Sequence, residues 1–144
     1  MRIYIAGSYS RRLELLARAG ELEALGHTIT SRWLDGHHET RPDIDETGSV
    51  GERANWAIED MSNIEGCNVF VVCNDGPGGG SRGGRHFEAG YAYARMAYRA
   101  GYYLFVIGDR ANPFYCTLRW RWVPDWQTFL DELSVVTMHE AQFE

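Results

Sequence analysis

The chain has 144 residues, the size of a single domain with one sizeable core. Its 44% hydrophobic and 24% charged residues are typical of a soluble globular protein, and its net charge of −6 argues against a nucleic-acid polymer or a membrane as partner. The three cysteines lack metal-ligand spacing, and no apolar run could span a bilayer. Because residues 1–6 pass directly into a predicted strand, we expect no signal peptide and a cytoplasmic protein.

The first part of the chain predicts a strand, a helix and a second strand, over residues 3–6, 11–25 and 27–31. The expected buried stripe of this helix is Leu13, Leu16, Ala17, Leu22 and Leu25. Such a unit is almost always right-handed with parallel strands. Residues 32–50 show little periodicity, and a loop of this length in a compact domain is usually functional or mobile.

The rest of the chain alternates helices and strands. Helices are expected over residues 50–64, 84–100 and 124–133. Strands are expected over residues 68–73, 102–107 and 120–123. The first of these helices should turn Ala54, Ala57, Ile58 and Met61 inward, and the residues after about 138 should form a frayed tail.

This alternation predicts an α/β fold: one doubly wound, flavodoxin-like parallel sheet of about five strands, with helices on both faces and residues 1–144 in a single domain. In such a sheet the ligand lies outside the carboxyl ends of the strands. A turn at Gly7 and Ser8 follows the first strand, and a glycine-rich loop follows the third. These strands are neighbours in a flavodoxin-like order, so both loops should face one crevice.

The glycine-rich loop, residues 76–84, predicts an anion site because it joins a buried strand to a helix start. Arg82 and Arg85 could clamp a phosphate or carboxylate, or be solvated loop charges. Ser81 and the backbone of Gly83 and Gly84 would add donors. The hydroxyl and N–H groups of Gly7 and Ser8 would supply a second contact to phosphate or sugar. His86 receives no role.

Two carboxylates are candidates for catalysis. Glu88 lies in the expected first turns of a helix, where it could merely complement the helix dipole, or could act as a nucleophile or base kept ionised by the dipole and two arginines. Tyr91 lies one turn later and could orient it. Asp60, late in another helix, could be an ordinary exposed acid or a second carboxylate at the site. Paired carboxylates with separate roles are what glycosidic cleavage needs.

Residues 78–83 also satisfy the dinucleotide pattern G-x-G-x-x-G between a strand and a helix, and Asp109 ends the next strand. An NAD- or NADP-binding domain is therefore an alternative. The signal is weak, because so glycine-rich a loop matches easily and follows the third strand instead of the first.

Three segments, residues 3–8 (IYIAGS), 60–72 (DMSNIEGCNVFVV) and 82–92 (RGGRHFEAGYA), give the chain its resemblance to a known group. It resembles the nucleoside 2-deoxyribosyltransferase superfamily, which includes the 2′-deoxynucleoside 5′-monophosphate N-glycosidases. The resemblance extends from residue 3 to about residue 115, and its most specific part is the segment around Glu88.

The resemblance implies that Glu88 attacks the anomeric carbon, that a covalent deoxyribosyl-enzyme forms, and that a second base or water resolves it. It implies that Asp60 handles the leaving base or the sugar, and that Tyr4, Gly7 and Ser8 line the sugar and phosphate. It implies no metal or organic cofactor, and a homodimer or larger oligomer.

The chain departs from the family pattern at its longer and more basic glycine loop, which favours a nucleotide over a free nucleoside. Base choice would fall to the segment that begins at Trp33, a weak candidate for the base pocket. A non-catalytic nucleotide sensor on the same fold remains a further alternative, and it would need no second carboxylate facing Glu88.

Overall fold

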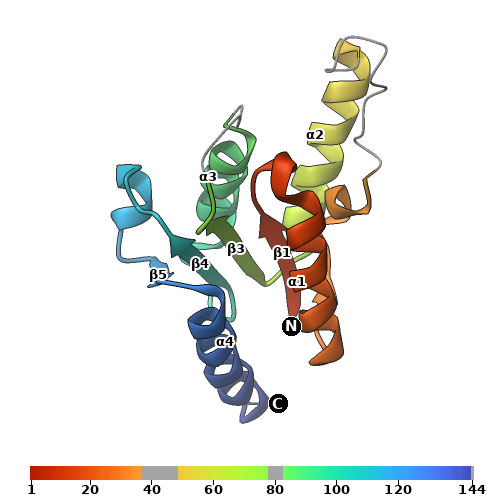
Figure 1. Ribbon diagram of the computed structural model, residues 1–144. Coiled ribbons are helices and arrows are strands. Elements are labelled where there is room, and N and C mark those ends of the chain that lie inside the picture. The colour runs from red at the N-terminus through yellow and green to blue at the C-terminus, as the bar shows by residue number, and fades with distance from the viewer. Residues whose placement is uncertain (37–48, 78–82, 144) are drawn as a thin grey trace.

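The computed structural model describes residues 1–36, 49–77 and 83–143, and its centre is one parallel sheet (Figure 1). The strand order is β2-β1-β3-β4-β5. The strands are β1 (Arg2–Ala6), β2 (Thr28–Ile29), β3 (Val69–Asn74), β4 (Tyr103–Gly108) and β5 (Trp120–Val123). All four strand pairings are parallel. The predicted flavodoxin-like α/β fold is confirmed.

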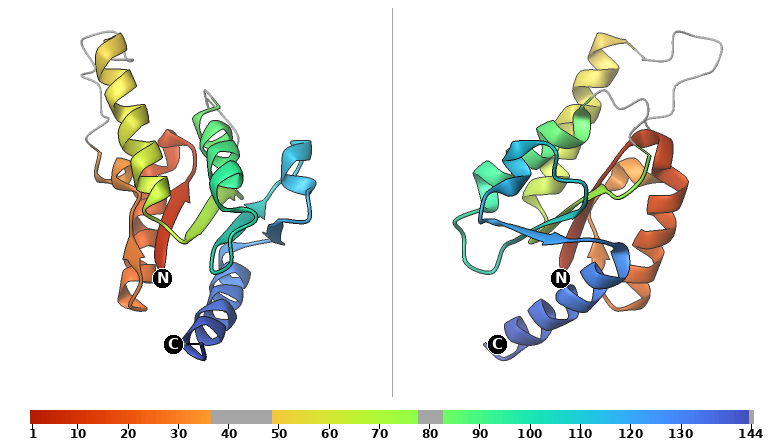
Figure 2. Two further views of the ribbon diagram at one scale, coloured as in Figure 1. Left: turned by 180° about the vertical axis from the view of Figure 1, so that it is seen from behind. Right: turned by 60° about the vertical axis from the view of Figure 1, so that its left-hand side comes forward.

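Helices cover both faces of the sheet. The α-helices are α1 (Arg12–Ala24), α2 (Val50–Glu65), α3 (Gly84–Met96) and α4 (Trp126–Ala141). Short 3₁₀ turns are η1 (Tyr9–Arg11), η2 (Arg32–Asp35) and η3 (Pro113–Cys116). Helices α2 and α3 lie on one face and α1 and α4 on the other, and α2 and α4 project at opposite ends of the molecule (Figures 1 and 2).

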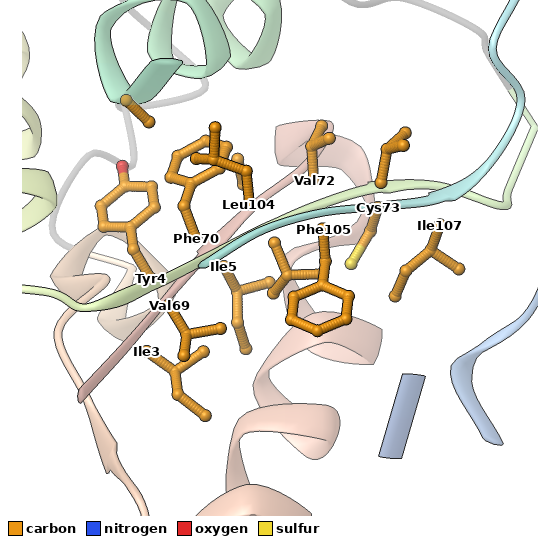
Figure 3. Close-up of a cluster of buried hydrophobic side chains, with 14 of the residues drawn as sticks. Ile3, Tyr4, Ile5, Val69, Phe70, Val72, Cys73, Leu104, Phe105 and Ile107 are labelled. Carbon is orange, nitrogen blue, oxygen red and sulfur yellow. The ribbon is translucent and has the colours of Figure 1, made fainter. Parts of the chain in front are cut away.

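The core follows from the nearly continuous apolar runs of the three central strands, which parallel strands buried on both faces require. In Figure 3, Tyr4 and Phe70 point to the face that carries α3, whereas Ile3, Val69 and Phe105 point to the opposite face. All five side chains are fully buried. Within the described residues, no helix is both long and apolar enough to cross a membrane.

The predicted stripes of two helices are largely wrong. In α1, Leu22 is buried as predicted, but Leu13 and Leu25 are 72% and 62% exposed, and the other buried residues are Leu15 and Ala19. Because leucines occur on all sides of this helix, the sequence pattern was compatible with more than one buried side. Packing against the sheet buries a different side from the predicted one. In α2, Ala54, Ala57 and Ile58 are exposed and Met61 is partly buried, because the first half of the helix extends beyond the sheet (Figure 2).

The expectation of a frayed tail is also wrong, because α4 continues to Ala141. Asp125 caps its start by accepting from the Thr128 N–H at 2.8 Å. Near its end, the Glu140 carboxylate accepts a hydrogen bond from the Tyr103 hydroxyl of β4. This contact fixes the last turns of the helix to the sheet.

Candidate active site

Tyr4, Asp60 and Glu88 come together from three different elements, β1, α2 and α3. Glu88 and Asp60 are close enough for the charge of Asp60 to raise the pKa of Glu88. Burial raises the pKa of Tyr4, and the charges of both carboxylates add to this effect. Helices α2 and α3 pack against each other on one face of the sheet, and the Tyr4 side chain points toward this face (Figure 3). The expectation of a second carboxylate beside Glu88 therefore agrees with the geometry.

The Glu88 carboxyl is held in its neutral form over much of the pH range. Burial is the main cause that raises its pKa from 4.5 to about 8, and the neighbouring charge of Asp60 adds to it. A contact with Tyr4 acts in the opposite direction. The raised pKa differs from the expectation that the helix dipole and two arginines keep Glu88 ionised, because desolvation is the larger effect among the described residues; Arg82 lies outside them.

Tyr4 forms the floor of this group. Its ring is fully buried and stacks on Phe70, with the ring centroids 5.5 Å apart and the planes 5° from parallel. Its hydroxyl points toward the face that carries α3 (Figure 3). There the hydroxyl is close enough to lower the pKa of Glu88, although neither it nor Glu88 Oε2 forms a hydrogen bond within the described residues. Tyr4 is thus both a core residue and a wall of the site.

Several polar atoms at this end of α2 and α3 are buried without a hydrogen-bond partner in the described part of the chain. They are the Tyr4 hydroxyl, Asn63 Nδ2, Arg85 Nη1 and Glu88 Oε2. Buried polar groups are normally paired, and leaving one unpaired costs about 1–3 kcal/mol. A polar ligand bound here would supply the hydrogen-bond partners that these atoms lack. The sequence prediction gave Asn63 no role, although it lies one helical turn after Asp60.

The start of α3 agrees in part with the predicted anion site. Its cap residue is Gly83, at φ 82°, a left-handed conformation that favours glycine, and Gly84 is exposed as the first helical residue. The first turn contains no acid. Arg85 donates from Nε to Asn74 Oδ1 at 3.0 Å, at the end of β3. Ser81 and Arg82 lie outside the described residues.

The turn after β1 is tightly packed. Ser8 is 7% exposed, and its Oγ lies 2.9 Å from the Ser10 Oγ. A Cβ at Gly7 would lie 2.3 Å from Leu15 Cδ1, so the packing of α1 requires glycine there. This is a packing reason for Gly7, and it leaves the predicted contact with a phosphate or sugar untested.

Two predicted site residues have other partners. The Tyr91 hydroxyl donates to Glu65 Oε1 on α2, so it is engaged by Glu65 and not by Glu88. The Trp33 indole is 5% exposed and donates from Nε1 to the Ile5 carbonyl at 2.8 Å. Trp33 is thus a buried support for β1. The rest of the loop that begins there, residues 37–48, lies outside the described residues.

A buried charge cluster that the sequence prediction missed joins α1 to the start of the glycine loop. Arg11 donates to the Cys73 carbonyl at 3.1 Å and pairs with Asp75 at 3.3 Å. Arg18 pairs with the other Asp75 oxygen at 2.7 Å. The two guanidinium groups help to hold the pKa of Asp75 below its ordinary value. The spacing of Arg11 and Arg18, two helical turns apart, was the available signal.

Removing this carboxylate should destabilise the fold. We expect Asp75→Ala to lower the free energy of unfolding by about 1.5–3 kcal/mol, because it removes the carboxylate that pairs with both Arg11 and Arg18, while Glu14 still pairs with Arg11 at 2.9 Å. Urea denaturation would measure the loss. Asp131→Ala, at an exposed position of α4, should change the free energy by less than about 0.5 kcal/mol. Equal stabilities of the two variants would show that the cluster contributes little.

A separate cavity of about 600 Å³ lies between α3 and η3. It is lined mainly by aromatic side chains, and Glu88, Asp60 and Tyr4 are not among its lining residues. The cavity is therefore distinct from the carboxylate pair.

Comparisons with known proteins show which fold this is. No protein-family model matches the chain, and no curated protein matches it. Among solved structures, it is similar to a 2-deoxyribosyltransferase from Bacillus psychrosaccharolyticus, with a TM-score of 0.63 and 20% identity over 90% of each chain. It is also similar to a CMP N-glycosidase, BcmB, from Clostridium botulinum, with a TM-score of 0.53 and 16% identity over 94% of this chain and 99% of that one. The resemblance seen in the sequence is thereby confirmed at the level of the fold.

Proposed function

We propose that this protein cleaves or transfers at the N-glycosidic bond of a 2′-deoxynucleoside or its 5′-monophosphate, with Glu88 as nucleophile. The observation that carries the proposal is the close pair of half-buried carboxylates, Glu88 and Asp60, on a fold shared with a deoxyribosyltransferase and an N-glycosidase. Two carboxyl groups in environments that separate their proton affinities can divide the roles of nucleophile and acid.

The raised pKa of Glu88 sets the protonation state of the pair. A proton is retained at Glu88 below about pH 8, while Asp60 exerts a negative charge on it. The reactive state has the same single proton on Asp60 and the charge on Glu88. Like charges at this separation disfavour a doubly ionised pair.

From that state, the bond between C1′ and the base nitrogen breaks as the Glu88 oxygen bonds to C1′. The electron pair leaves with the base, and Asp60 supplies the proton that neutralises it. Positive charge develops on the sugar, where the buried carboxylate stabilises it more strongly than in water. Water or a second base then attacks C1′, and the bond between C1′ and the Glu88 oxygen breaks, which restores the Glu88 carboxylate. Asp60 takes up the proton that the attacking group loses, so the pair again holds one proton.

The α3 N-terminus and Arg85 favour the 5′-monophosphate as substrate. Arg85 Nη1 is buried without a partner in the described residues, and helix N-termini attract phosphate. We expect Arg85→Gln to raise KM for a deoxynucleoside monophosphate about 10–100-fold, because charged hydrogen bonds are worth about 1.5–3 kcal/mol. KM for the free deoxynucleoside should stay within about twofold. Equal effects on KM for both substrates would show that Arg85 does not bind the phosphate.

The proposal is tested by chromatographic detection of released base. Deoxynucleosides and their 5′-monophosphates are supplied separately, with and without a second base. Release from monophosphates would establish a nucleotide N-glycosidase, and a new nucleoside that forms only with added base would establish a transferase. Binding without release would favour the nucleotide sensor. A thermal shift with NAD or NADP alone would favour the dinucleotide-binding domain, whose glycine pattern falls largely on residues outside the described part of the chain.

We further propose that the protein forms a homo-oligomer through α2. The apolar side of this helix is open to solvent in the single chain: Val50 is 74% and Ile58 62% exposed. Exposed apolar residues grouped on one helix indicate a contact surface. Ile58→Glu should therefore lower the mass measured by sedimentation, whereas Glu132→Gln on α4 should not. An unchanged mass for Ile58→Glu would exclude this surface.

A further inference from the structure

The cavity between α3 and η3 lies on the side of α3 that faces away from the carboxylate pair. Its α3 wall includes His86, Gly90 and Tyr93, which share one side of the helix. Glu88 projects from the opposite side of the same helix, toward Asp60 and Tyr4. The two sites therefore lie on opposite sides of α3, although burial and, to a smaller extent, the charge of Glu88 raise the pKa of Tyr115 in the cavity wall.

The cavity exists because of how the sheet is covered. Helices α2 and α3 pack over β1, β3 and β4, and the described residues contain no helix over β5 on this face (Figure 1). Trp120 of β5 contributes to the floor of the cavity, and Phe87 and Phe114 stand at its sides with 66% and 77% of their surfaces exposed. Aromatic faces on several sides of a volume of about 600 Å³ suit a planar ring of small-molecule size.

The cavity wall also carries polar groups. His86 Nδ1 lies 2.7 Å from the Tyr115 hydroxyl. The side chains of Thr117 and Tyr98 and the charge of Arg119 lower the pKa of Tyr93. A ligand with hydrogen-bonding groups at its edge and a negative charge would find partners among these groups.

The charge of the surrounding segment points the same way. Residues 83–123 contain six arginines and two acids, although the whole chain has a net charge of −6. One of these arginines, Arg119, stacks at 4.5 Å on the ring of Tyr98, which in turn contacts Tyr93 of the cavity wall at 6.4 Å. The excess of positive charge in this segment favours an anion.

We propose that the cavity between α3 and η3 is a second binding site, separate from Glu88, for a planar aromatic anion of nucleotide size. The ring lies among Phe87, Phe114 and Trp120, and the anionic group lies toward Arg119, whose charge reaches Tyr93 in the cavity wall. The inference stands on the cavity alone and does not depend on the proposed reaction.

Gly90 allows a direct test, because a Cβ at this position meets nothing within 4 Å and faces the cavity. Gly90→Leu fills the cavity and raises helix propensity. Gly20→Leu is the matched control, because Gly20 lies in α1 with open space around it. The probe is 2′-deoxypseudouridine 5′-monophosphate, whose carbon–carbon glycosidic bond the proposed reaction cannot cleave. Calorimetric titration of the full chain gives the number of sites and their affinities.

We expect Gly90→Leu to weaken one site at least tenfold, and Gly20→Leu to leave it unchanged. Phe114→Ala, which removes an exposed wall, should also weaken it. If Gly90→Leu loses that site but still releases base from its substrate, the result would support two separate sites. If Gly90→Leu loses the site and the natural chain releases no base from any substrate, the result would support the cavity site and contradict the proposed function. A Gly90→Leu titration identical to that of the natural chain, or no binding of the probe to that chain, would overturn the inference.

Discussion

Replacing Glu88 by glutamine is expected to reduce base release by about 10³–10⁵-fold while leaving the chain folded. The amide keeps the size and the hydrogen-bonding capacity of the side chain but cannot form the ester with C1′. Losses of this size are usual when a nucleophile is removed, because binding and electrostatic stabilisation leave a residual rate. A chromatographic assay of the two proteins at equal concentration measures the effect. Glu132→Gln, an exposed glutamate on α4, should retain full activity.

The same variant should be more stable than the natural chain at alkaline pH. Because the folded-state pKa of Glu88 is raised from 4.5 to about 8, the folded protein binds the extra proton between these values. Its contribution to stability is thus fully present below pH 4.5 and is lost as pH rises through 8. Above pH 8 the buried charge costs about 2–5 kcal/mol, which Glu88→Gln removes. Urea unfolding that shows no growing difference between pH 5 and pH 9 would contradict the burial of an ionisable Glu88.

Replacing Asp60 by asparagine is expected to move the pH dependence of the reaction. In the natural chain, kcat/KM should fall as pH rises through about 8, because the pair then loses the single proton that the reactive state carries on Asp60. Asp60→Asn removes this proton and also the negative charge that helps to raise the pKa of Glu88, so the variant should instead show a rate that rises with pH as Glu88 alone ionises, in a limb that lies below pH 8. The limb should still lie above 4.5, since burial is the larger cause. The maximal rate should fall by about 10²–10⁴-fold, because the acid that protonates the leaving base is lost.

Glu59→Gln is the matched control for this experiment, because Glu59 precedes Asp60 on the same helix and lies beside Arg32. Glu59→Gln should leave both the pH dependence of kcat/KM and the maximal rate unchanged. If Asp60→Asn lowered the rate without changing the pH dependence of kcat/KM, the two carboxylates would not be coupled. If both variants changed this pH dependence equally, a general change of surface charge would explain the result.

The strands and their order were predictable because buried parallel strands are marked by continuous apolar runs, as in residues 69–73. The residues of α1 and α2 that face the sheet were not predictable from the sequence. In α1, Leu13 and Leu15 are both apolar, and only the tertiary packing distinguishes the exposed one from the buried one. In α2, the periodicity of Ala54, Ala57 and Ile58 is real, but the sheet does not extend beneath them.

For the candidate site, the sequence indicated Glu88 and Asp60 as a pair, through the resemblance and the chemistry of paired carboxylates. It did not indicate that Glu88 would be protonated, since burial depends on how α2 packs on α3. Tyr91 was expected to orient Glu88 from helical spacing alone, but Glu65 from the neighbouring helix engages its hydroxyl. Contacts between helices are the part of the site that spacing along one helix cannot predict.

The central claim is that Glu88 becomes bonded to the sugar during turnover. The most direct measurement is an acid quench of the enzyme during steady turnover of a deoxynucleoside 5′-monophosphate, followed by proteolysis and peptide mass mapping. The account predicts a deoxyribosyl phosphate adduct on the peptide that contains Glu88, absent from Glu88→Gln. An adduct on a different peptide, or base release that persists at the natural rate in Glu88→Gln, would contradict it.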